Sequence, residues 1–159
     1  MNMAPDAPET AEAGQSCDTA PAAKKMAIIV TRGNHNQMVT VFTLVMAAAV
    51  CEMPVRIFFR DEAVYKLSKQ KIGEMNLSEI YADRADQVKE NYERAGMVDL
   101  QKVIRETKAQ GDIQLFACTS SMALAGLTQD DLIPEIDEAR GLTSFLLEEV
   151  EGADLLLTF

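Results

Sequence analysis

Tryptophan is absent from this sequence, histidine occurs once, and the three cysteines stand far apart. An odd number of widely spaced cysteines, Cys17, Cys51 and Cys118, fits neither a disulfide framework nor the ligand spacing of a zinc site. We therefore expect free thiols. Cys51 ends an apolar run, so we expect it in the core.

Positive charge is also scarce, because 15 Lys and Arg stand against 25 Asp and Glu, a formal net charge of -10. Such a surface repels phosphate backbones and anionic lipid headgroups, so we expect neither nucleic acid nor a membrane as a partner. The longest apolar run, 38–51, is interrupted by Thr40 and Thr43 and is shorter than the ~18 residues of a membrane helix. Free thiols without a secretory signal pattern predict a cytoplasmic protein.

The first 24 residues lack Ile, Leu, Val and every aromatic residue. They are rich in Ala and Pro and cannot bury enough apolar surface to offset the entropy lost on ordering. We therefore predict a flexible tail over 1–24, which contains Cys17, and a single domain over 25–159. With 48 % hydrophobic residues, the chain can build a substantial core.

Short apolar runs alternate with segments of helical spacing along the rest of the chain. We expect strands at 26–30, 55–59 and 113–117, a short one around Ile133 and Ile136 within 132–138, and a closing one at 154–159, with helices at 38–51, 83–95, 99–110, 119–127 and 142–150. The first strand, helix and strand form a βαβ unit, which requires a parallel sheet. The sequence predicts an α/β fold, a three-layer α/β/α sandwich with a mainly parallel sheet of about five strands.

Ligands of such sheets bind outside the carboxyl ends of the strands, where Cys118 is the central candidate. It ends a strand and begins a helix, where free N–H groups and the helix dipole favour a thiolate. Thr119, Ser120 and Ser121 add hydroxyl donors. We expect a thiol that is open to solvent and supported by backbone amides. The competing interpretation is a packed residue, which is common for a free cysteine.

The surroundings of Cys118 narrow its chemistry. A dithiol motif is missing because Ser121 stands where C-x-x-C has its second cysteine, and a C-x5-R phosphatase motif is missing because Leu124 replaces the arginine. Residues 122–127 contain no base to close a rhodanese-type loop. A single thiolate that accepts a group and passes it on remains, and a persulfide carrier needs little more.

The polar loop after the first strand, 31–37, holds the other candidates. His35 could assist Cys118 as a proton donor or a cation, although a solvated loop histidine or one that makes a loop hydrogen bond is the simpler interpretation. Arg32 could attract an anionic sulfur donor. The loop has neither phosphate-binding glycine pattern, and no cluster has metal-ligand spacing, so we expect no cofactor and no metal.

Six short segments, taken in order, carry a resemblance to a known family. They are AIIV at 27–30, VRIFF at 55–59, FACTSSM at 116–122, GLTQDDL at 126–132, GLTSFL at 141–146 and ADLLLTF at 153–159. Together they resemble the DsrE/DsrF-like sulfur-relay family, in the branch often described as peroxiredoxin-like. The resemblance covers about residues 25–159.

The resemblance implies a DsrE/F-like fold, a homo-oligomer (trimer or hexamer), and sulfur transfer through a persulfide on a cysteine that maps onto Cys118. It also implies a small sulfur-carrier protein or a rhodanese as partner. We therefore expect a sulfurtransferase or sulfur carrier that holds sulfane sulfur on Cys118. The alternative is a non-catalytic binding or assembly module in which Cys118 is only packed. A thiol peroxidase has less support, because peroxide chemistry needs a supporting Arg and a resolving thiol.

Overall fold

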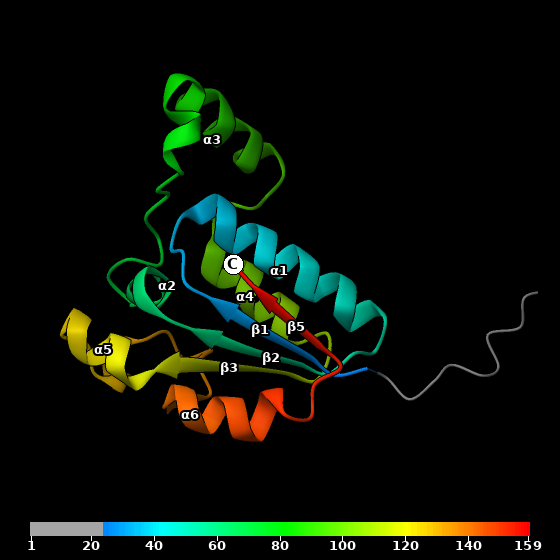
Figure 1. Ribbon diagram of the computed structural model, residues 1–159. Coiled ribbons are helices and arrows are strands. Elements are labelled where there is room, and N and C mark those ends of the chain that lie inside the picture. The colour runs from blue at the N-terminus through cyan, green and yellow to red at the C-terminus, as the bar shows by residue number, and fades with distance from the viewer. Residues whose placement is uncertain (1–23) are drawn as a thin grey trace, which may run out of the picture.

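Five parallel strands form one sheet in the computed structural model, which describes residues 24–159 (Figure 1). The strands are β1 (Met26–Val30), β2 (Val55–Phe59), β3 (Ile113–Cys118), β4 (Glu138–Arg140) and β5 (Leu155–Thr158). Their order is β4-β3-β2-β1-β5. The predicted tail, with Cys17, lies outside the described residues except for Lys24.

Helices cover both faces of the sheet (Figure 1). They are α1 (His35–Val50), α2 (Asp61–Lys66), α3 (Ala85–Arg94), α4 (Leu100–Lys108), α5 (Thr119–Ala125) and α6 (Leu142–Phe145), with 3-10 turns η1 (Glu79–Arg84) and η2 (Gln129–Asp131) and a π-helical turn η3 (Leu146–Val150) that continues α6. Helices α1 and α4 pack together on one face, and α6 lies on the other. The expected three-layer sandwich is therefore confirmed.

Packed aromatic rings connect the helices on both faces of the sheet to the central strand, β2. Phe42 of α1 stacks on Phe59, with ring centroids 6.3 Å apart. Phe145 of α6 stacks on Phe58 at 4.7 Å and approaches Phe116 at 5.7 Å. Because Phe58 and Phe59 are adjacent in β2, they point to opposite faces of the sheet. A strand buried on both faces explains the nearly continuous apolar run that identified it in the sequence.

The fourth strand differs from its prediction. It lies at Glu138–Arg140, and the apolar residues that suggested it, Ile133 and Ile136, are buried in the loop before it. The amide of Ile133 donates to the carbonyl of Leu67 and so takes no part in the sheet. The apolar residues here therefore indicated burial and not a strand. The edge strand itself consists of charged and small residues.

One helix boundary and the burial of one cysteine also differ from their predictions. The first helix begins at His35 and not at 38, because the amide of His35 donates to the carbonyl of Asn76 and Asn34 takes the N-cap position. Cys51 is exposed, so its predicted place in the core is wrong. It follows the last turn of α1 as the C-cap, beyond the part of the helix that faces the sheet. None of the described helices is long and apolar enough to cross a membrane.

Candidate functional site

Parallel register brings the candidate residues to one edge of the sheet. Val30, Phe59 and Ala117 lie level on β1, β2 and β3. The segments that follow these strands therefore share the carboxyl edge, which is where ligands of open parallel sheets bind.

Cys118 lies at this edge, as the last residue of β3 and the N-cap of α5. However, the residue is only 2 % exposed, and its side chain accepts no capping hydrogen bond. The expectations of an open thiol and of amide support are therefore wrong for this conformation. The thiol is packed because the side chain of Cys118, like that of Phe116 two residues earlier, points to the face that α6 covers.

The hydroxyl residues after Cys118 divide into two exposed ones and one buried one. Thr119 and Ser120 face solvent, whereas Ser121 is 4 % exposed. The amide of Asp61 donates to Ser121 Oγ at 3.0 Å, and this hydroxyl donates to Asp61 Oδ1 at 3.2 Å. We call this pair of hydrogen bonds the Asp61–Ser121 clasp. It joins the start of α2 to the first turn of α5.

Asp61 adopts an unusual backbone conformation in the clasp. Its φ of 49° lies in the left-handed region, which non-glycine residues rarely adopt.

 The other described non-glycine residue in this region is Glu52, with a φ of 55°, which lies in the turn after α1. Strained residues of this kind persist where surrounding contacts hold them, and they gather at functional sites. In Asp61 the clasp supplies such contacts, at the edge of the sheet that carries Cys118.

Arg140 is the strand neighbour of Cys118, since the two residues are paired in the β3–β4 register. Its guanidinium lies over the ring of Phe116, 4.3 Å from the centroid. Glu138 and Glu149 accept hydrogen bonds from it at distances between 2.5 and 3.1 Å. The bonds to Glu138 raise the pKa of Arg140, so the guanidinium stays charged. These carboxylates neutralise the charge of Arg140 beside Cys118. No sequence pattern indicated Arg140 as a site residue.

His35 and Arg32 lie in the loop after β1 and at the start of α1. His35 is 1 % exposed, its Nε2 lies 2.8 Å from the carbonyl oxygen of Met97, and its ring meets Tyr92 edge-on at 5.3 Å. Burial lowers the pKa of His35. Arg32 is exposed and lies 3.8 Å from a carboxylate oxygen of Glu62. The structure thus joins His35 to the segment between α3 and α4, and Arg32 to α2.

A metal site would require several ligating side chains close together. Over residues 24–159, no group of three or more His, Cys, Asp or Glu side chains is arranged to hold a metal ion.

Comparison with known proteins gives a family and a fold. The model of the DsrE/DsrF-like family matches residues 24–159. No curated protein matches the chain. Among solved structures, the chain is similar to a protein of unknown function from Methanobacterium thermoautotrophicum, with 11 % identity and a TM-score of 0.54. The likeness covers 84 % of this chain and 98 % of that one, and at this identity it shows the fold alone.

The buried state of His35 predicts a loss of stability in mild acid. Because the folded state holds the pKa of His35 below 6.5, the unfolded chain binds more protons as the pH falls through 6.5. Stability should fall there by up to about 1 kcal/mol per pH unit. Urea unfolding of the wild type and of His35→Gln, whose amide can replace the contact to Met97, measures the effect. We expect a weaker pH dependence in the variant, and equal curves would contradict this explanation.

Proposed function

Because this chain belongs to the DsrE/DsrF-like family, which is generally linked to sulfur relay, we propose that it carries sulfane sulfur as a persulfide on Cys118. The sulfur then passes to a partner protein, such as a small sulfur-carrier protein or a rhodanese. The observation that carries the proposal is the position of Cys118 at the carboxyl end of β3. Cys51, in contrast, follows α1 at the amino edge of the sheet, just before β2.

The proposed reaction consists of two thiol exchanges. The Cys118 thiolate attacks the outer sulfur of a donor persulfide, the donor S–S bond breaks, and the donor leaves as a thiolate. An acceptor thiolate then attacks the outer sulfur of the Cys118 persulfide, and the Cys118 thiolate is released. Both steps require contact with another molecule, so the packed thiol of Cys118 has to become accessible.

Opening of helix α5 would give this access, because Cys118 is its N-cap and would move with it away from the face that α6 covers. It has seven residues, and only Ser121 and Met122 are buried, whereas Leu124 is 89 % exposed. Segments with so few buried contacts open locally at a lower free energy than global unfolding requires. Among the polar contacts of α5, the Asp61–Ser121 clasp opposes this opening. Because each hydrogen bond contributes a net of about 1 kcal/mol, the clasp adds only modestly to the free energy of opening α5.

A second candidate function has one specific observation in its favour. Because Cys118 is 2 % exposed and accepts no capping hydrogen bond, its thiol can serve as a core residue alone. The protein would then be a binding or assembly module of the same fold. The two functions differ in whether Cys118 reacts while the protein remains folded.

Sulfur loading tests the proposed function. We expect wild-type protein incubated with a persulfide donor to gain the mass of one sulfur atom on Cys118, as detected by mass spectrometry. Cys51→Ser should keep this gain and Cys118→Ser should lose it, because exposed Cys51 lies at the other edge of the sheet. No added sulfur on the wild type, or sulfur retained in Cys118→Ser, would refute the proposal.

Removal of the clasp should expose the thiol more often. In a background of Cys17→Ser and Cys51→Ser, we expect iodoacetamide to label Cys118 about thirty-fold faster in Ser121→Ala, since two hydrogen bonds of about 1 kcal/mol each are lost. Ser120→Ala is the matched control, because Ser120 is exposed. Equal rates in both variants would show that the clasp does not control access. Absence of labelling in every folded variant would favour the packed module.

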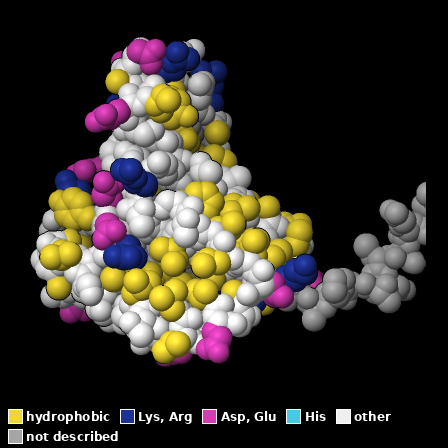
Figure 2. All heavy atoms as spheres, in the orientation of Figure 1, with side chains coloured by type: hydrophobic (Ala, Val, Ile, Leu, Met, Phe, Trp, Pro, Cys, Tyr) yellow, Lys and Arg dark blue, Asp and Glu magenta, His cyan; other side chains and the backbone are white. Residues whose placement is uncertain are grey.

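Self-association is a further part of the proposed function, because an apolar face lies open on the protomer. Figure 2 shows hydrophobic side chains gathered over β5, α6 and part of α1. Exposed apolar residues of these elements and their continuations are Met46, Val50, Leu146, Leu147, Leu155, Leu156 and Phe159. Within residues 24–159, strand β5 pairs with β1 alone, and the leucines of β5 do not protect its free edge from pairing with another chain. Homo-oligomer interfaces are apolar and poor in charge, so this face suits a second copy.

Light scattering tests the trimer or hexamer that the proposal includes. We expect an oligomer for the wild type and a smaller species for Leu156→Glu, which places a charge in the apolar face. Leu124→Glu should keep the wild-type mass, because this exposed residue belongs to α5. A monomeric wild type would contradict self-association.

A further inference from the structure

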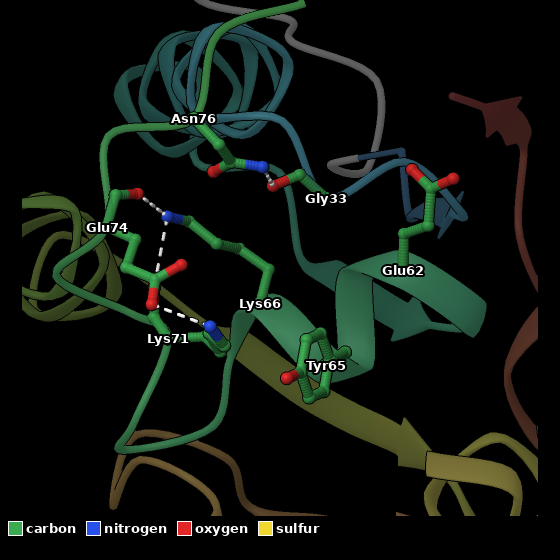
Figure 3. Close-up of a pocket in the computed structure, with 7 residues that line it drawn as sticks. All are labelled: Gly33, Glu62, Tyr65, Lys66, Lys71, Glu74 and Asn76. Atoms are coloured by element: carbon green, nitrogen blue, oxygen red, sulfur yellow. Dashed lines mark hydrogen bonds and ion pairs between the residues drawn. The ribbon is translucent and has the colours of Figure 1, made fainter.

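A buried lysine faces a cavity that Cys118 does not line. The cavity has a volume of 180 Å³ and lies between the loop after β1, helix α2 and the segment that follows α2. It is lined by Gly33, Glu62, Tyr65, Lys66, Lys71, Glu74 and Asn76 (Figure 3). The position is the carboxyl edge of β1 and β2, where open parallel sheets hold their ligands.

Lys66 is 3 % exposed, and its ammonium has only backbone partners. Its Nζ donates to the carbonyl of Lys71 at 3.2 Å and to the carbonyl of Glu74. Within the described part of the chain, no carboxylate lies at ion-pair distance from it. An ammonium has three N–H donors, so one of them has no protein acceptor here.

The acids around the cavity are paired with other cations. The Glu74 carboxylate accepts from Lys71 Nζ at 2.7 Å. Glu62 lies near Arg32 and extends away from Lys66 in Figure 3. The charge of Glu74 acts on Lys66 from a distance and raises its pKa slightly against the effect of burial, but among residues 24–159 no carboxylate forms a direct ion pair with Lys66. Burial lowers the pKa of Lys66 to about 8, so the ammonium form still predominates at neutral pH.

We propose that this cavity binds a small oxyanion, a carboxylate or an oxyanion of sulfur or phosphorus, with the Lys66 ammonium as its counter-ion. A buried charge is stabilised by a partner of opposite sign, and the bound anion supplies the one that the protein lacks. The volume is well below the roughly 300–1,000 Å³ of pockets for drug-sized ligands, so the ligand has few heavy atoms. The wall of the cavity is tightly packed at Gly33, because a Cβ at this position would lie 2.4 Å from the carbonyl oxygen of Glu62.

Anion binding at this site is linked to protonation. The anion stabilises the ammonium form of Lys66, so its binding raises the pKa of Lys66 from about 8 towards the ordinary value of 10.5. By the same linkage, affinity for the anion falls as the pH rises above 8. This behaviour distinguishes the cavity from a surface lysine, whose charge persists over that range.

Nuclear magnetic resonance of the lysine side chains tests the proposal, with sulfate and acetate as probes and chloride at equal ionic strength as reference. We expect either probe to raise the pKa of Lys66 by about one unit and to leave that of exposed Lys69 unchanged. Glu74→Gln should bind the probe roughly five-fold more tightly, because it frees the charge of Lys71. Glu90→Gln is the control, since it makes the same change of net charge on α3.

Two results would overturn the oxyanion site. One is a Lys66 titration that is the same in sulfate, acetate and chloride. The other is an equal gain of affinity in Glu74→Gln and Glu90→Gln, which would indicate long-range attraction without a local site. Neither result depends on Cys118, so the oxyanion site and the proposed sulfur chemistry are tested independently of each other.

Discussion

Two hydrogen bonds between Asp61 and Ser121 hold the start of α2 against the first turn of α5, and in the proposed function they oppose the opening that exposes Cys118. The parallel register makes this contact possible, because it sets the ends of β2 and β3 level at one edge. Asp61 adopts a left-handed φ of 49° in the clasp. A conformation of this kind costs of order 1–3 kcal/mol, so the two elements meet under some strain, and the proposed function requires them to separate without global unfolding.

A covered thiol suits a sulfur carrier in one respect. A persulfide that is always exposed exchanges with any thiol it meets, whereas one that is packed in the closed state reacts only during opening. The cation nearest in register, Arg140, is neutralised by carboxylates, so it gives the closed site little excess positive charge. In the proposed function, activation of the sulfur therefore has to come from contacts that form in the open state.

Sequence patterns predicted what depends on local periodicity. The β-branched run at Met26–Val30 and the spacing within Ala85–Arg94 identified a strand and a helix of this fold, and Cys118 was located at the end of its strand. Burial of Cys118, the clasp and the cavity of Lys66 could not be predicted in this way. Each depends on how segments remote in sequence approach one another, and Asp61 and Ser121 are 60 residues apart.

The rate at which iodoacetamide labels Cys118 in urea below the unfolding transition is the most direct test of access through local opening. A local opening exposes little new surface, so the rate should be nearly independent of urea and faster than global unfolding allows. A rate that rises with urea along the full slope of global unfolding would contradict it, because Cys118 would then react only in the unfolded chain.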